Sequence, residues 1–186
     1  MFVRSIGLVL GALASTVVAG SLVATPASAE TLAQGRVVAS GGVVARSLPT
    51  TASEDFGTYA KGEQVTLLCK LRGSTVDGNS IWYRTPSEGS TWVTARYVEN
   101  IGAAPRYCGS SARYTGRTTA ALTKREAPTT RTAAHGTIAK GTKITVICKW
   151  EGDTVGGNSF WYHLTDGRWV AARYVTNIGT APELCL

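Results

Sequence analysis

Histidine is scarce in this sequence, and no metal-binding pattern of cysteines is present. The 186 residues include two histidines and four cysteines, and no Cys-x-x-Cys pair occurs. Structural zinc sites need clustered cysteine and histidine ligands. We therefore expect no metal ligands and no cofactor.

A basic stripe is also missing, although the chain is basic overall. It has 19 Lys and Arg against 12 Asp and Glu, a formal net charge of +7. Beyond the N-terminal segment the basic residues are scattered, with Lys124 and Arg125 as the only adjacent pair. Scattered basic charge is more typical of solubility than of recognition, so we expect no nucleic-acid partner.

Only one long apolar run occurs, from Ile6 to Ala24. Arg4 precedes it, and Ala27-Ser28-Ala29 follows with the small-x-small pattern of a signal-peptidase site. A membrane anchor is the alternative, because the run is nearly long enough to span a bilayer. Pro26 and the glycine, serine and threonine content favour cleavage. We expect residues 1–29 to be a signal peptide and the rest to be secreted, without stable membrane insertion.

The remaining chain contains one stretch twice, at 57–108 and 136–185, and more than half of the aligned positions are identical. Both copies open with Gly-Thr-x-Ala-Lys-Gly and end with Arg-Tyr-Val-x-Asn-Ile-Gly-x-Ala-Pro-x-x-Cys. Two copies of this length favour two small domains over a solenoid. We expect a first domain at 35–108, a linker at 109–116 and a second domain at 117–186.

Short strands separated by turn residues are expected in both repeats. Residues 66–71, 81–84 and 92–95, with their counterparts, are strand-like, and no convincing amphipathic helix occurs. Asp77-Gly78-Asn79 and Gly156-Gly157-Asn158 are typical of hairpin turns. The expected fold class is all-β, with two small barrels rather than sandwiches.

The four cysteines lie at matching positions, two in each repeat, which indicates disulfides in an exported chain. Four cysteines allow three pairings. The duplication favours Cys69–Cys108 with Cys148–Cys185, because each repeat would then be self-contained.

Each repeat resembles a bacterial Src-homology-3-type (SH3-like, SH3b) domain, over 43–102 and 122–179. Besides the motifs quoted above, the resemblance rests on Arg-x-x-Pro-Thr at 46–50 and 125–129 and on the Trp-Val pairs near the end of each copy. It implies tandem SH3-like β-barrels with a short helical turn at Arg-Tyr-Val. It also implies non-catalytic attachment to peptidoglycan peptides or to another protein. The residues before the arginine and before the proline depart from the family pattern, so ligand preferences of that loop are not transferred.

The aromatic residues of the repeats are the candidate binding groups. Strand alternation places Trp82 and Arg84 on the face opposite Ile81 and Tyr83. If the Ile81 face points inward, the tryptophan is exposed for binding; the alternative is that it completes a core. The tyrosines of the Arg-Tyr-Val turns resemble the tyrosine that lines the peptide groove of related barrels. The candidate ligand-binding residues are Trp82, Arg84, Tyr97, Trp161, His163 and Tyr174.

No catalytic residues are expected. His163 stands where the first repeat has Arg84, His135 aligns with Phe56, and almost no carboxylate is shared by both copies. The first hypothesis is a secreted protein with two weak sites for the peptide portion of cell-wall peptidoglycan, which would gain from effective concentration on a polymer. The second is a secreted protein–protein interaction module or inhibitor that recognises a peptide or partner protein. The third is a small secreted hydrolase that uses polar residues of one copy.

Overall fold

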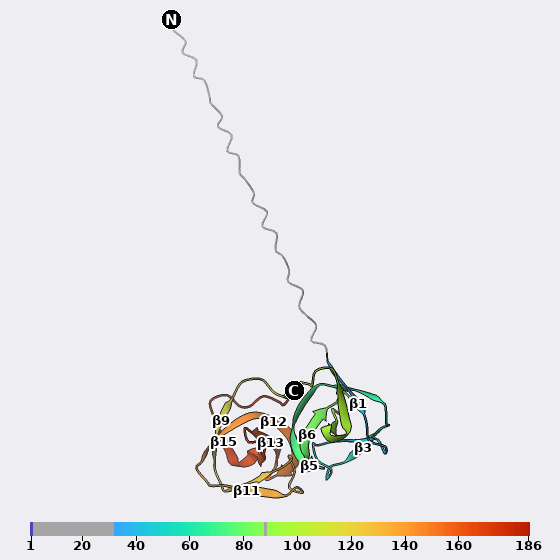
Figure 1. The fold of residues 1–186 in the computed structure, drawn as a ribbon. Helices are drawn as coiled ribbons and strands as arrows, with labels where there is room; N and C mark the ends of the chain where they lie inside the picture. The colour runs from blue at the N-terminus through green and yellow to red at the C-terminus, as the bar shows by residue number, and fades with distance from the viewer. Residues whose placement is uncertain (2–31, 88) are drawn as a thin grey trace. The chain divides into compact units, whose positions relative to one another are not determined.

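The strands of both repeats are present in the computed structural model, which describes Met1 and residues 32–87 and 89–186 (Figure 1). The regular structure of these residues is β-strand apart from two single 3-10 turns, so the all-β expectation is confirmed. Residues 31–186 belong to one compact unit. The predicted signal peptide lies, apart from Met1, outside the described residues. Within them, no helix is long and apolar enough to cross a membrane.

The first repeat is built from two antiparallel sheets, with strand orders β4-β1-β8 and β3-β2-β7-β6-β5. The 3-10 turn η1 connects β7 to β8, where the family resemblance places a helical turn. The elements are β1 (Ala33–Val37), β2 (Val43–Arg46), β3 (Asp55–Tyr59), β4 (Gln64–Leu67), β5 (Cys69–Val76), β6 (Asn79–Arg84), β7 (Trp92–Thr94), η1 (Ala95–Tyr97) and β8 (Val98–Ile101).

The second repeat has the same order of elements in one sheet, β11-β10-β14-β13-β12-β9-β15. Its long strand β12 replaces the pair β4 and β5, and so joins what are two sheets in the first repeat. The elements are β9 (Tyr114–Thr118), β10 (Leu122–Arg125), β11 (Ala134–Ile138), β12 (Lys143–Val155), β13 (Asn158–Leu164), β14 (Trp169–Ala171), η2 (Ala172–Tyr174) and β15 (Val175–Ile178).

The first strand of each repeat begins earlier in the sequence than the predicted domain boundary. β1 begins at Ala33, before the predicted domain start at 35. β9 begins at Tyr114 and pairs with β12 and β15, so the last three residues of the predicted linker 109–116 belong to a strand. The linker prediction is wrong there because Tyr114 is buried in the core of the second repeat, whereas a linker residue would be solvated.

The predicted hairpin turns connect β5 to β6 and β12 to β13. Asp77 and Gly78 have φ values of 43° and 80°, and Gly156 and Gly157 have values of 56° and 82°. Two successive residues with positive φ are the requirement of the tight hairpin turn that matches strand twist. Glycine and a short polar residue meet this requirement at low cost, which explains the sequence signal.

Each repeat has a core of its own. It lies on one face of the central hairpin, formed by β5 and β6 in the first repeat and by β12 and β13 in the second, and this face carries the tyrosine. In the first repeat Tyr83 packs with Val93 and Leu67, and in the second Tyr162 packs with Val170 and Val146. The side-chain alternation predicted for this strand is therefore correct on its inner face. A third cluster lies on the opposite face.

This third cluster, which we call the junction cluster, contains residues of both repeats. Its contacts are reciprocal: Trp92 meets Trp150 of β12 edge-on at 5.6 Å between ring centroids, and Trp169 donates its indole N–H to Arg72 O of β5 at 3.2 Å. The repeats therefore bury apolar surface against each other. The buried members are Cys69, Leu71, Trp82, Trp92, Cys108, Cys148, Trp161, Trp169, Ala171 and Cys185.

The disulfides pair Cys69 with Cys108 and Cys148 with Cys185, so the favoured pairing is confirmed. Each connects the central hairpin to the segment that follows the last strand of the same repeat. Backbone hydrogen bonds beside each bridge hold this segment, at Lys70 with Cys108 and at Lys149 with Cys185. All four sulfur-bearing side chains are buried in the junction cluster. The bridges therefore stabilise the same region that joins the repeats.

Removing the second disulfide should destabilise the protein strongly. The bridge spans 37 residues of sequence. Closing a loop of that size constrains the unfolded chain by about 4 kcal/mol on the chain-entropy model. We expect a Cys148→Ala/Cys185→Ala variant to lose about this free energy of unfolding in guanidinium titrations. A loss below about 1 kcal/mol would contradict the role assigned to the bridge.

Candidate binding clefts at the junction of the repeats

Trp82 and Trp161 are buried, at 1% and 2% exposure. Their indole N–H groups donate to Ser74 O and Asp153 O, each at 2.8 Å. The prediction of an exposed binding group at these two positions is wrong. Alternation places them on the outer face of their strands as expected, but the junction cluster covers that face instead of water.

Two glycines allow the segments that contain Pro49 and Pro128 to approach the backbones of β5 and β12 closely. A Cβ at Gly73 would lie 2.1 Å from Pro49 O, and a Cβ at Gly152 would lie 1.9 Å from Pro128 O. The adjacent residues Ser74 and Asp153 donate their backbone N–H groups to the same two carbonyls. Only glycine permits this approach, so the shared Gly73/Gly152 position is structural.

Arg84 and His163, which correspond in the two repeats, also lie in the junction. The Arg84 guanidinium lies 5.1 Å over the Trp150 ring, and burial together with the charge of Arg106 lowers its pKa. His163 stacks on Trp169 at 4.5 Å, and burial lowers its pKa to about 4. Both are candidate ligand contacts, but Arg84 is covered by Trp150 of the other repeat and His163 by Trp169 of its own repeat.

Tyr97 and Tyr174 remain accessible on the two 3-10 turns, Tyr97 half-buried and Tyr174 36% exposed. The Tyr97 hydroxyl donates to the Asp77 carboxylate, and this hydrogen bond raises the pKa of Tyr97. Tyr174 has no such partner, since Gly156 occupies the position of Asp77. Tyr97 packs against the core of the first repeat rather than the junction cluster. The structure therefore does not assemble one groove from the predicted tryptophans and tyrosines.

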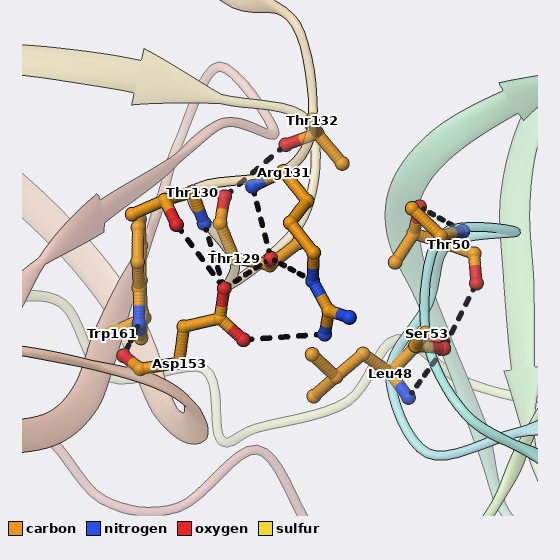
Figure 2. A network of polar contacts seen from close by, with 10 residues as sticks. Leu48, Thr50, Ser53, Thr129, Thr130, Arg131, Thr132, Asp153 and Trp161 are labelled. Carbon is orange, nitrogen blue, oxygen red and sulfur yellow. Dashed lines mark hydrogen bonds and ion pairs between the residues drawn. The ribbon is translucent and has the colours of Figure 1, made fainter.

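A polar network specific to the second repeat surrounds Asp153 (Figure 2). Its carboxylate accepts hydrogen bonds from Thr129 Oγ1 at 2.5 Å and Thr130 N at 3.1 Å, and the Arg131 guanidinium lies 3.4 Å away. Burial opposes ionisation, but these hydrogen bonds and the arginine charge together lower the pKa of Asp153. The first repeat has Ser74 at this position, so the network has no counterpart there.

A cavity of about 620 Å³ lies beside this network and takes residues from both repeats. A second cavity, of about 640 Å³, shares Phe160, Leu184 and Leu186 with it. We call the two together the junction cleft. Its aromatic residues are Trp150 and Phe160, its apolar residues are Leu48, Leu184 and Leu186, and its charged residues are Glu54, Arg106, Arg131, Lys149, Glu151, Asp153 and Glu183.

Trp150 and Phe160 are the cleft residues that the sequence analysis missed. Both are half-buried. The first repeat has Leu71 and Ile81 at their positions, so a search for aromatics shared by the copies passes over Trp150. Strand alternation assigns Phe160 to the core side, and Phe160 does pack against the core of the second repeat while it also lines the cleft. The usable signal is the opposite one: a large aromatic residue in only one copy.

The cleft can bind a ligand that carries apolar groups and charges of both signs. Glu54 and Glu151 are exposed, and the Arg131 side chain is 54% exposed despite its contact with Asp153. In Figure 2 the Arg131 side chain extends toward Leu48 of the first repeat, and both residues line the cavity. Among the described residues, no group of three or more His, Cys, Asp or Glu side chains could hold a metal ion.

Replacing Trp82 should cost stability rather than a ligand contact. Removing a fully buried tryptophan leaves a cavity and an unpaired carbonyl, at about 3–5 kcal/mol for the change to alanine. We expect this loss for Trp82→Ala in urea titrations. Phe56→Ala is the control, because Phe56 is 57% exposed and its loss should cost under about 0.5 kcal/mol. Equal effects of the two changes would contradict the junction cluster.

His163 should make stability depend on pH. Its pKa is about 4 in the folded protein, against an ordinary value of 6.5, so folding favours the neutral ring. This stabilisation is complete above pH 6.5 and is lost as the pH falls toward 4, on the order of 3 kcal/mol in total. The pKa values of Asp153 and Asp166 are held below 3.8, so their contribution is lost mainly below this window.

The measurement is urea unfolding at pH 7.5 and 4.5, for the native protein and for His163→Phe. Phenylalanine keeps the stacking on Trp169 but does not titrate. The native protein should lose roughly 2–3 kcal/mol more than the variant between these pH values. Identical losses would show that His163 is not held neutral by burial.

Comparisons with known proteins give weak likenesses. No protein-family model and no curated protein matches the chain. Among solved structures it is similar to a chain described as endolysin LysPBC5 CBD, with 13% identity and a TM-score of 0.31, over 81% of this chain and 97% of that one. It is also similar to NlpC2 from Trichomonas vaginalis, with 12% identity and a TM-score of 0.28, over 80% and 49%. At these TM-scores neither likeness assigns a family, and the Src-homology-3 assignment stays a prediction.

Proposed function

We propose that this protein is a secreted, non-catalytic binding protein that attaches to the peptide portion of bacterial peptidoglycan through the junction cleft. The observation that carries the proposal is the cleft itself, in which two aromatic rings, three leucines and charges of both signs come together. The resemblance of the repeats to wall-attachment domains supplies the ligand class.

The aromatic pair provides the apolar part of the binding surface. Trp150 is fixed by its edge-on contact with Trp92 and by the Arg84 guanidinium. Phe160 is flanked by the Lys149 ammonium, 5.1 Å from its ring centroid. Rings held in this way lose little conformational freedom when a ligand covers them, which favours binding of small apolar groups such as alanine methyls.

The charged residues match a short zwitterionic peptide. Arg131 offers guanidinium donors to a ligand carboxylate, and the exposed Glu54 and Glu151 offer acceptors to an ammonium group. Peptidoglycan stem peptides contain alanine, free carboxylates and a diamino acid, so they carry all three kinds of group. A ligand with one charge sign alone would leave part of the cleft unpaired.

The remaining polar chemistry supports binding rather than catalysis. All four cysteines are in disulfides. His163 is buried and held neutral, and the His135 Nε2 is 2.8 Å from Glu126, which also contacts Arg168 at 3.5 Å. These are structural pairs that position no nucleophile beside a base. Two disulfides also fit an extracellular protein.

Co-sedimentation with purified peptidoglycan at low salt tests the proposal, with variants that exchange residues between the repeats. Trp150→Leu introduces the counterpart Leu71 and should reduce the bound fraction about tenfold, since a central aromatic contact is worth roughly 1.4 kcal/mol or more. Phe56→His introduces the counterpart His135 outside the cleft and should leave binding unchanged. Glu151→Gln, at an exposed position, should weaken binding about threefold without loss of stability.

Two outcomes would contradict the proposal. If the native protein remains in the supernatant, peptidoglycan is not the ligand. If Trp150→Leu and Glu151→Gln both sediment like the native protein, the cleft is not the site. Thermal unfolding of each variant separates loss of binding from loss of fold. Retention by one protein from culture fluid, without retention by peptidoglycan, would favour the protein–protein alternative.

A further inference from the structure

A further cavity, of about 540 Å³, shares Arg106, Gly109 and Ser110 with the junction cleft but has a lining of one charge sign. It lies between β5, the segment 106–113 and the end of β13, and it includes Arg72, Arg106 and Arg113. Among the described residues that line it there is no Asp or Glu. We call it the arginine cavity. The junction cleft, by contrast, mixes both signs.

Arg72 and Arg113 have no acidic partner in the part of the chain that the structure describes. Arg72 donates to Ser80 Oγ at 3.1 Å, and Arg113 donates to the carbonyls of Ser111 and Ala112 at 3.1 and 2.9 Å. These acceptors are neutral, so they orient the guanidinium groups without cancelling their charge. Arg106 donates to Tyr107 O and Leu186 O.

A buried polar atom without a partner lies in the wall of the same cavity. His163 is 5% exposed and lines the cavity, and its Nε2 has no hydrogen-bond partner among the described residues. With the ring neutral and its other nitrogen bonded to the Gly167 backbone, Nε2 is a hydrogen-bond acceptor, so this atom does not contribute to binding an anion.

The arginine charges act on neighbouring groups, and Asp166 lies close to Arg72 just outside the lining. Arg106 lowers the pKa of Arg84, after the larger effect of burial. At His163 burial is the largest effect, the Gly167 backbone and the Asp166 charge raise the pKa, and Arg72 lowers it by less than either. Lys70 lies 5.0 Å over the ring of Tyr107, an exposed residue of the lining, and adds another cation nearby. An anion in the cavity would relieve the repulsion between Arg84 and Arg106.

We propose that the arginine cavity binds a phosphate group. Guanidinium groups bind phosphate through paired N–H donors, and a phosphate has enough oxygens to accept from more than one arginine. A single carboxylate has only two oxygens and one negative charge, so it would leave N–H donors and positive charge of three arginines unpaired. The phosphate could belong to a small phosphorylated molecule or to the phosphodiester links of a cell-wall polymer, which present the same chemistry.

The test is an NMR titration of the ¹⁵N-labelled protein at about 20 mM ionic strength, where screening is weak. Sodium pyrophosphate represents the small molecule and poly(glycerol phosphate) the polymer. Saturable shifts are expected at the backbone amides of residues 111–113 and Gly167, which do not line the junction cleft, with at least one probe. The probe with the higher affinity identifies the source. No peptidoglycan is present, so the result is independent of the function proposed for the junction cleft.

Matched variants separate a site from general charge. Arg72→Gln/Arg113→Gln should raise the dissociation constant about tenfold. Arg36→Gln/Arg117→Gln removes the same charge from exposed residues outside the cavity and should change it less than about threefold. Arg113→Gln alone, whose own hydrogen bonds are only to two neighbouring carbonyls, should give about a threefold loss if the double variant is unstable.

The proposal is overturned if neither probe gives saturable shifts. It is also overturned if the two double variants weaken binding equally, because net charge alone would then explain the effect.

Discussion

The interaction on which the rest of the structure depends is the packing of the two repeats against each other, through four buried tryptophans and the disulfide that each repeat contains. Domains of this size bury too little surface to be comfortably stable alone. Here the outer face of each central hairpin, carrying Trp82 or Trp161, is covered by the other repeat. The disulfides lie in the same cluster and fix the segments that follow the last strands. The junction thus supplies apolar burial that neither repeat's own core provides.

The local structure could be predicted from the sequence, but the relation between the repeats could not. The hairpin turns and the disulfide pairing follow from glycine positions and from the duplication. Alternation also separates Tyr83 from Trp82 correctly. The two-residue alternation of side chains along a strand shows only that its two faces differ. It does not show what covers the second face. The polar neighbour Arg84 suggested water there, yet its guanidinium lies over the Trp150 ring of the other repeat.

The candidate sites arise where the two copies differ. Shared residues such as Trp82 and Gly73 maintain the fold and the junction, so a search for what the copies share selects structural positions. The junction cleft depends on Trp150, Asp153 and Phe160, where the first repeat has Leu71, Ser74 and Ile81. The two copies are therefore not interchangeable. Duplication supplies the scaffold, and divergence supplies the cavity walls.

Because each cavity takes residues from both repeats, two independent weak sites are a poor description of this arrangement. The junction cleft joins Leu48 of one repeat to Trp150 of the other, and the arginine cavity joins Arg72 to His163. A ligand that contacts both repeats binds only when they are associated. By mass action it therefore stabilises their association. Conversely, a change that weakens the tryptophan packing must weaken binding in both cavities. Avidity on a repeating polymer would then require several molecules rather than the two repeats of one.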